Sequence, residues 1–519
     1  MPDLVLGPIL RHVDTSSATV WVQTDGPCTV EVAGCEARTF QVGGHHFALV
    51  VITGLTEGST PYQVRLDGEQ VWPLDGLPPS RIRITGDAEF SMVFGSCRIP
   101  ESDDPALGRD ATAAYAQRMS GQDERQWPDS LVLLGDQVYA DETTEAMRDW
   151  ISRRRPVGDP PGVANFDEYV HLYYEAWSTR WNRWLMSTVP TSMIFDDHDV
   201  IDDWNTSQTW REQMERTDWW AERETAALVS YWIYQHIGNL APADLAADPT
   251  YNKVIEAQGD AIGVLRTYAQ KAIEEVDGRK TSRWSYRRDF GRVRLLMLDT
   301  RAGRILSGDR QIINDEEFTW IEANAEGDYD HLLLGSSLPW LMPHVISDLQ
   351  SLNEIGCRRP GWRGRLAEKI RQVCDLEHWP AFRASFDRMA RLVRRIADGD
   401  VATVCVLSGD VHHVYTAEAH FDKPVKAKVY QLVCSPTHNR VPALMRPFFR
   451  LAWSRGMSAV SRWWLRRHIP TAPVEWTKLG GPYVGNAIAT LRISGRRAEV
   501  LVEKAADLSP VTELTLSTG

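Results

Sequence analysis

The stretch LVLLGDQVYAD, residues 131–141, begins as an apolar run and ends in side chains that can bind a metal ion. Three further runs share this pattern: FSMVFGSCR at 90–98, SMIFDDHDV at 192–200 and VCVLSGDVHHVY at 404–415. Each run predicts a short buried strand, because parallel strands are apolar on both faces. Polar residues just past such strands meet at the carboxyl edge of a sheet, where α/β proteins bind ligands. The four runs therefore predict one site built from four distant segments.

The sequence around these runs predicts two domains. From about residue 88 onward, apolar strands alternate with helical stretches, which predicts an α/β (α+β) catalytic domain at 88–519. Long helical insertions are predicted near 204–276 and 365–396. Residues 1–87 instead hold short alternating segments separated by Gly, Pro, Asp and Ser turns, which predicts a small, fibronectin-type-III-like β-sandwich.

Composition narrows the class of partner. The 519 residues carry 57 Lys+Arg against 70 Asp+Glu, a formal net charge of -13. This charge repels a phosphate backbone, so we expect a small substrate and no nucleic acid as main partner. Seven cysteines without dense spacing do not make a disulfide framework. No basic leader, twin arginine or apolar stretch of about 18 residues is present, so we expect a cytoplasmic protein.

The residues that follow two of the strands favour metal chemistry over ordinary turns. Asp136 leaves its strand and Tyr139 follows within one turn of backbone, so a carboxylate and a phenol can face one ion. A Gly-Asp pair in isolation would predict only a turn. DDHD at 196–199 places four ionisable residues in succession. A solvated turn explains this run poorly, because packing like charges is costly unless a cation or hydrogen bonds compensate.

The other two strand ends carry histidine and cysteine. GDVHH at 409–413 supplies one Asp and two His. A lone His is usually structural, whereas this triple favours a metal or acid/base role. Cys97 by itself would be an inert buried thiol. Its position at a strand end, among these partners, favours a thiolate ligand.

The chain carries five short motifs in this order: FGSCR, GDQVYAD, FDDHDVIDDW, LDTR and LSGDVHH. Their combination resembles the alkaline phosphatase D (PhoD-like) family of metallophosphoesterases. The resemblance covers residue 90 to the C-terminus, and the preceding β-sandwich also resembles the small first domain of that family. It implies a calcineurin-like core, in which two β-sheets pack face to face with helices outside and a binuclear metal site at one edge. It also implies an alkaline phosphatase or phosphodiesterase activity.

The same resemblance implies a set of metal ligands. Asp136 matches the bridging aspartate of the family. The other ligands of the first metal are expected at Cys97, Tyr139 and His412. Those of the second metal are expected at Asp197 and Asp410, with Asp196, water or substrate completing the set. Two acidic ligands favour Ca²⁺, Mn²⁺ or Mg²⁺ at the second position, whereas thiolate, phenolate and carboxylate together favour Fe³⁺, then Zn²⁺, at the first.

Four further residues are candidates for catalysis. His198 resembles the family's non-ligand histidine, which protonates the leaving group, and Asp199 is expected to hold its imidazole tautomer. Arg98 and Arg301 are candidates for binding phosphate oxygens, because a guanidinium fork matches their geometry. A structural ion pair is the alternative for each arginine.

These residues predict a metal-dependent phosphoric-ester hydrolase that acts on small phosphate esters. The alternative from another class is a catalytically silent metal-containing binding or scaffold protein. Such a protein has no need of a proton donor such as His198, or of an open water position. A phosphohydrolase based on a His-Asp doublet is disfavoured, because those doublets lie on helices and 198–199 follows a strand.

Residues 440–468 differ in charge from the rest of the chain, with seven arginines and no acid among interleaved apolar residues. We expect a helical insertion whose apolar face packs on the core while its arginines pair with the protein's own acids. The alternative is a basic amphipathic helix on an anionic membrane, with lipid head-group esters as substrates.

Overall fold

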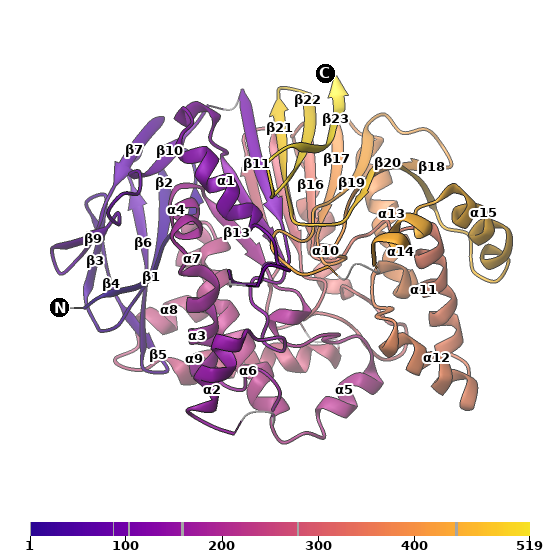
Figure 1. Ribbon diagram of the computed structural model, residues 1–519, viewed down its shortest axis with the longest axis horizontal. Helices are drawn as coiled ribbons and strands as arrows, with labels where there is room; N and C mark the ends of the chain where they lie inside the picture. Colours follow the sequence, from indigo (N-terminus) through magenta and orange to yellow (C-terminus); the bar gives the residue numbers. More distant parts are fainter. Residues whose placement is uncertain are drawn as a thin grey trace.

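The computed structural model describes residues 2–86, 88–101, 104–156, 160–277, 280–441 and 445–518. Asp87, the last residue of the predicted first domain, lies outside them. Along its longest axis the molecule has β-strands of the N-terminal region at one end, two large sheets in the middle and a group of helices at the other end (Figure 1).

The N-terminal region is rich in short strands, as the alternating segments predict. Its strands form two four-stranded sheets, ordered β1-β2-β6-β5 and β4-β3-β8-β9, and a ribbon of β10 and β7. The strands are β1 (Leu4–Val13), β2 (Ser17–Thr24), β3 (Thr29–Val32), β4 (Cys35–Arg38), β5 (Phe40–Val42), β6 (His45–Thr53), β7 (Gly58–Tyr62), β8 (Val64–Leu66), β9 (Glu69–Trp72) and β10 (Ser80–Ile84).

Two larger sheets form the catalytic region. The first is ordered β13-β12-β11-β21-β22-β23 and the second β14-β15-β16-β17-β19-β18-β20. The first sheet contains β11 (Glu89–Gly95), β12 (Ser130–Leu134), β13 (Thr191–Ile194), β21 (Ala487–Ser494), β22 (Arg497–Lys504) and β23 (Pro510–Thr518). The second contains β14 (Tyr286–Phe290), β15 (Val293–Leu298), β16 (His331–Ser336), β17 (Thr403–Ser408), β18 (Val414–Phe421), β19 (Lys428–Val433) and β20 (Val474–Tyr483).

All four apolar runs are strands, but they do not share one sheet. Strands β11, β12 and β13 are parallel neighbours in the first sheet, whereas β17 lies between β16 and β19 in the second. The carboxyl ends of both sheets therefore contribute to the site.

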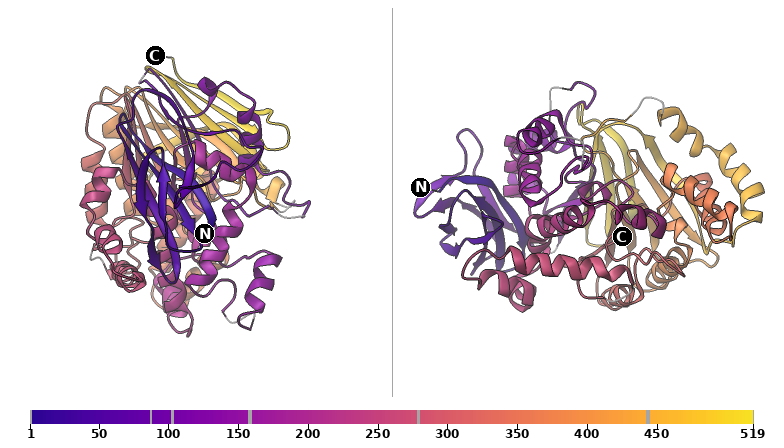
Figure 2. Two further views of the ribbon diagram at one scale, coloured as in Figure 1. Left: turned by 90° about the vertical axis from the view of Figure 1, so that its left-hand side faces the viewer. Right: turned by 90° about the horizontal axis from the view of Figure 1, so that it is seen from below.

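Helices lie outside the two sheets (Figure 2). In the described ranges they are α1 (Ala111–Ser120), α2 (Glu145–Ser152), α3 (Phe166–Trp177), α4 (Arg180–Thr188), α5 (Gln208–Met214), α6 (Trp220–Tyr231), α7 (Pro242–Ala247), α8 (Pro249–Ile255), α9 (Ile262–Ile273), α10 (Asp315–Asn324), α11 (His344–Cys357), α12 (Trp362–Val373), α13 (Arg383–Ala397), α14 (Met445–Ala452) and α15 (Arg455–Trp464). Helices α5 to α9 fall in the first predicted insertion, and α12 and α13 overlap the second. The predicted fold class, a double β-sheet sandwich flanked by helices, is confirmed. No helix in the described ranges is long and apolar enough to cross a bilayer.

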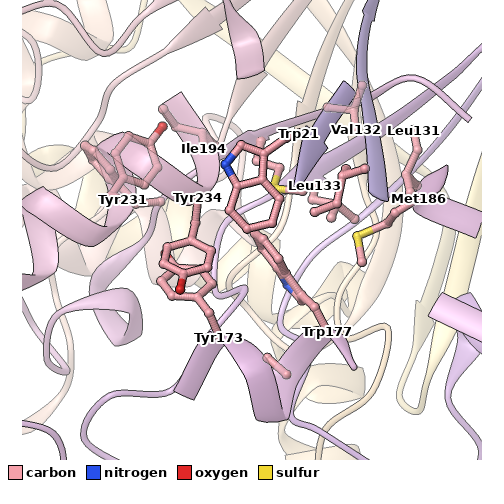
Figure 3. Close-up of a cluster of buried hydrophobic side chains, with 14 of the residues drawn as sticks. Trp21, Leu131, Val132, Leu133, Tyr173, Trp177, Met186, Ile194, Tyr231 and Tyr234 are labelled. Atoms are coloured by element: carbon pink, nitrogen blue, oxygen red, sulfur yellow. The ribbon is translucent and has the colours of Figure 1, made fainter. Parts of the chain in front are cut away.

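The N-terminal strands pack directly on the catalytic region. Trp21 of β2 lies among Tyr173 and Trp177 of α3, Tyr234 and the apolar residues of β12 (Figure 3). The Trp21 and Tyr234 ring centroids are 5.2 Å apart, and Tyr234 stacks on Tyr173 at 4.1 Å. Buried Arg11 of β1 donates hydrogen bonds to the carbonyl oxygens of Tyr234, at 2.7 Å, and of Gln235, at 2.6 Å. One continuous core therefore joins the two regions.

Candidate metal centre

The structure brings the predicted metal ligands together where β11, β12, β13 and β17 end. These ligands are Cys97 after β11, Asp136 and Tyr139 after β12, Asp196 and Asp197 after β13, and Asp410 and His412 after β17. Backbone hydrogen bonds connect the loops: Arg98 N donates to Asp136 O at 3.0 Å, and Asp410 N donates to Ser96 Oγ at 3.2 Å. The predicted single site from four segments is therefore what the fold builds.

The backbone at this centre is strained. Cys97, Asp136, Asp410 and His412 have φ values of 57, 50, 65 and 47°, in the left-handed region that L side chains seldom occupy. Such conformations cost on the order of 1–3 kcal/mol each and persist where surrounding structure imposes them. Four of the predicted ligands adopt this conformation, which indicates that the packing around the centre, rather than local backbone propensity, imposes these turns.

Two glycines allow the strand ends to approach each other. A Cβ at Gly135, which has a φ of 103°, would lie 2.6 Å from Asp196 Cβ. A Cβ at Gly409 would lie 1.9 Å from Ser96 Oγ. Both distances are far below a van der Waals contact, so the glycines before Asp136 and Asp410 are required by close packing of the loops.

Three buried carboxylates form the heart of the cluster. Asp136, Asp196 and Asp197 each offer an oxygen within 4.8 Å of the others. Asp136 Oδ1 and Asp196 Oδ2 have no hydrogen-bond partner among the described residues. Burial above all, with neighbouring negative groups adding to it, raises the pKa of Asp136 and of Asp196 well above the usual range. A cation would compensate the buried charge and fill the vacant acceptor sites, so this donor set fits metal ions.

The soft and aromatic donors lie against Asp136. Cys97 Sγ is 3.2 Å and Tyr139 Oη 3.5 Å from Asp136 Oδ2. Burial raises the pKa of the Cys97 thiol to about 12 and that of the Tyr139 phenol well above its usual range. Burial lowers the pKa of His412 to about 4, so its imidazole is neutral at pH 7. Metal binding would therefore release the thiol and phenol protons, because these groups bind a metal ion in their deprotonated forms.

Arg301 lies inside the acidic cluster rather than at an open surface. Its fully buried guanidinium pairs with Asp196 and Glu377, and its Nη2 lies 3.1 Å from Asp197 Oδ1 and 3.7 Å from Asp410 Oδ1. The structural ion pair, which the sequence left open, is thus the arrangement present. Its partners are this set of four carboxylates.

Arg98 also occupies a buried ion pair. Its Nε and Nη2 lie 2.9 and 2.8 Å from Asp110 Oδ2, and its Nη1 donates to the carbonyl of Ala176. The guanidinium therefore fastens α1 and α3 to the loop after β11, and its predicted contact with phosphate stays a prediction.

His198 is held by Asp141. Its Nδ1 lies 3.0 Å from both carboxylate oxygens of Asp141, while its Nε2 has only exposed Asp202, at 3.9 Å. The ring faces that of Tyr139, with centroids 4.7 Å apart. Burial opposes the imidazolium form, but Asp141 and neighbouring carboxylates outweigh it and raise the pKa of His198 well above its usual range. Asp141 thus engages Nδ1 and leaves Nε2 as the ring nitrogen on the other side.

The predicted role of Asp199 is wrong. Its Oδ2 accepts from the backbone N–H of Asp136, at 3.0 Å, and of Asp196, at 2.9 Å, and its Oδ1 accepts from Gln235 at 3.1 Å. Residues 197–199 form a 3₁₀ turn, in which successive side chains point about 120° apart. His198 and Asp199 therefore cannot face each other, and Asp199 instead ties two ligand loops together.

Sequence reasoning missed three polar partners at the centre. Asp141 ends the GDQVYAD motif, so its place in that motif is a signal in the sequence. His378 lies between α12 and α13, and its Nε2 is 2.8 Å from Asp410 Oδ2. Asn439 lies six residues past β19, and its Nδ2 donates to Tyr139 Oη at 2.8 Å. His413 is structural, because its Nδ1 faces Val411 O at 2.7 Å and its Nε2 accepts from Trp453 at 3.2 Å.

Comparisons with solved structures agree with this fold. The structure of PhoD is similar with a TM-score of 0.60 and 11% identity over 99% of this chain and 89% of that one. A purple acid phosphatase from seeds of yellow lupin (Lupinus luteus) is similar with a TM-score of 0.52 and 10% identity over 99% of this chain and 74% of that one. No curated protein matches the chain by sequence.

Two family models match separate parts of the chain. A domain of unknown function (DUF7800) matches residues 1–84. The model described as PhoD-like phosphatase matches residues 110–445, more than half of the chain. Cys97 and Arg98 precede that match, so their place at the centre is known from the structure alone. The strand ends, the buried carboxylates and the family model lead to one conclusion: the chain belongs to the PhoD-like phosphatase family.

Proposed function

We propose that the protein is a hydrolase of small phosphate esters with a two-metal centre. The observation that carries this proposal is the buried carboxylate cluster, with vacant oxygens on Asp136 and Asp196, together with the ring of His198 that Asp141 holds through Nδ1. A structural metal site would need the carboxylates but would have no use for a proton donor at its edge.

The donors divide between two ions. Asp136 would bridge, because its carboxylate lies within 3.5 Å of the Cys97 thiol and the Tyr139 phenol and also belongs to the cluster with Asp196 and Asp197. Cys97, Tyr139 and His412 would complete the first position, as Fe³⁺ or Zn²⁺ ligands. Asp197 and Asp410, with Asp196, would hold Ca²⁺, Mn²⁺ or Mg²⁺ at the second. When bound, the ions would activate water for attack on phosphorus and neutralise charge on the phosphate.

His198 supplies the proton for the leaving group. Asp141 orients the ring through Nδ1, so Nε2–H is the group free to donate. The ring lies against that of Tyr139, with centroids 4.7 Å apart, which supports a donor beside the proposed metal ligands. Arg301 positions Asp196 and Asp197 through its buried ion pairs and prevents their mutual repulsion from opening the loops.

Elemental analysis combined with an ester panel tests the proposal. Purified protein should contain two metal ions per chain and hydrolyse p-nitrophenyl phosphate, bis(p-nitrophenyl) phosphate or both. Asp136→Asn should lose both ions and all activity, whereas Asp123→Asn, at an exposed turn ahead of β12, should lose neither. A protein that keeps its metal but hydrolyses no mono- or diester would support the scaffold alternative instead.

A further inference from the structure

Exposed apolar side chains are concentrated at one end of the molecule. Thirteen large apolar residues are exposed in the described part of the chain, and ten of them belong to α11, α12, α14 and α15. They are Leu349, Trp362, Leu366, Ile370, Val373, Phe448, Leu451, Val460, Trp463 and Trp464. These helices lie together, opposite the N-terminal strands (Figures 1 and 2). Exposed apolar side chains concentrated on neighbouring helices are typical of an interaction site.

Helix α12 has its amphipathic faces reversed. Trp362, Leu366, Ile370 and Val373 follow one another at helical spacing, and all four are exposed, Trp362 by 64% and Val373 by 72%. The inward face is polar: Arg371 is buried and pairs with Glu368 at 2.9 Å and with Glu354 of α11. A helix on the surface of a protein normally turns its apolar stripe inward. This stripe therefore has no partner within the described residues.

The same surface is strongly basic. Residues 358–373 hold five arginines and one lysine against one glutamate, and residues 445–468 hold six arginines and no acid, in a chain of net charge -13. Eight of these cations have no acidic partner within the described ranges: Arg359, Arg363, Arg365, Lys369, Arg446, Arg450, Arg455 and Arg467. Within 440–468, the expected pairing with the protein's own acids occurs for Arg440, Arg462 and Arg466. It does not extend to the other four arginines of that segment, which are among the eight.

Arginine and tryptophan are paired on this surface. The Arg363 guanidinium lies 5.5 Å from the centroid of Trp362, and that of Arg467 lies 4.9 Å from the centroid of Trp463. Tryptophan and arginine together suit the membrane–water interface, where the ring reaches the acyl boundary and the cation remains with the head groups. A second copy of the chain fits poorly, because a symmetric contact through this surface would oppose like charges.

We propose that the surface of α12, α14 and α15 binds an anionic lipid membrane peripherally. The apolar stripe supplies the insertion and the eight unpaired cations supply the attraction to acidic head groups. The metal centre lies directly behind this surface: Phe449 of α14 stacks on His413 at 3.9 Å, and His378, five residues past α12, contacts Asp410. Binding therefore brings the centre close to the bilayer, whatever ester it acts on. Residues 442–444 of the segment lie outside the described ranges.

Co-sedimentation with vesicles tests the proposal. Wild-type protein should bind vesicles that contain about 30% phosphatidylglycerol in phosphatidylcholine, should release them at about 0.5 M salt, and should not bind phosphatidylcholine alone. Arg363→Gln/Arg365→Gln/Arg467→Gln should weaken binding about a hundred-fold, because each cation near an anionic surface contributes about five-fold. Trp463→Ser/Trp464→Ser should weaken it as well.

A matched charge control is Arg38→Gln/Arg153→Gln/Arg216→Gln, which removes the same charge from exposed positions elsewhere and should bind like wild type. Equal weakening by both triple variants would show only a net-charge effect and overturn the proposal. So would a wild-type protein that fails to bind anionic vesicles at low salt. A third outcome would also overturn the proposal. If the wild-type protein does not bind vesicles but forms dimers, and the tryptophan variant is monomeric, a second copy of the chain covers this surface.

Discussion

Replacing Asp141 with Asn tests the geometry around His198 most directly. The substitution keeps the size of the side chain and an oxygen acceptor for His198 Nδ1–H, but it removes the charge that supports the imidazolium. Hydrogen bonds to charged groups contribute about 1.5–3 kcal/mol. At about 1.4 kcal/mol per factor of ten, Asp141→Asn should lower kcat for an alkyl phosphate by about 10- to 10²-fold.

The pH profile should move in a defined direction. Burial lowers the pKa of His198 and Asp141 raises it, so removing the carboxylate lowers it. A proton donor must be protonated to act, so activity falls as pH rises through this pKa. The alkaline limb of the kcat profile of Asp141→Asn should therefore shift to lower pH. p-Nitrophenyl phosphate should show a smaller loss than methyl phosphate, because nitrophenolate departs without a proton.

Three matched variants complete this assay. His198→Ala should lose about 10²- to 10⁴-fold with its metal retained, and the double variant with Asp141→Asn should lose no more than His198→Ala alone. Asp202→Asn, 3.9 Å from Nε2 and 63% exposed, should lose less than about five-fold, because exposed ion pairs contribute at most about 1 kcal/mol. Unchanged methyl phosphate hydrolysis by metal-replete Asp141→Asn would refute the reasoning.

Three further outcomes are expected. If the first metal is Fe³⁺ bound to phenolate, the purified protein should show a visible charge-transfer band that Tyr139→Phe abolishes, whereas a colourless, active zinc protein would contradict the iron assignment. Asp199→Ala should lower the melting temperature and the metal content together. The reason is that two buried backbone N–H groups lose their acceptor, which costs about 1–3 kcal/mol of folding free energy each. Unchanged stability would mean that water replaces the carboxylate. Trp21→Ala should lower the free energy of unfolding by about 3–5 kcal/mol in urea titrations, because it leaves a cavity in the core between the N-terminal strands and the catalytic region. Exposed Trp362→Ala, its control, should change stability by less than about 0.5 kcal/mol.

The linear sequence was sufficient to predict the strands and the residues that gather at their ends. FSMVFG, LVLLG, SMIF and VCVLSG are apolar on both faces, and this local pattern requires burial whatever the rest of the chain does. Ligand-type residues one to three positions past a buried strand must emerge at its carboxyl edge. Cys97, Asp136 and Asp410 therefore lie together, as predicted, although the strands belong to two sheets.

Tertiary structure decided how side chains at that edge pair. Asp199, next to His198 in the sequence, is the expected partner of its imidazole, but the 3₁₀ turn at 197–199 points it away and Asp141 takes that position. Arg301 became the counter-ion of the acidic cluster because loops from β13, β15 and β17 converge on it.

The faces of the surface helices were decided in the same way. The sequence of α12 contains a clear apolar stripe, and an apolar stripe alone predicts an inward face. In the fold, Glu354 and Glu368 hold Arg371 inward and leave that stripe outside. Burial of a strand follows from its own residues, whereas the direction of one side chain depends on partners that only the folded chain brings near.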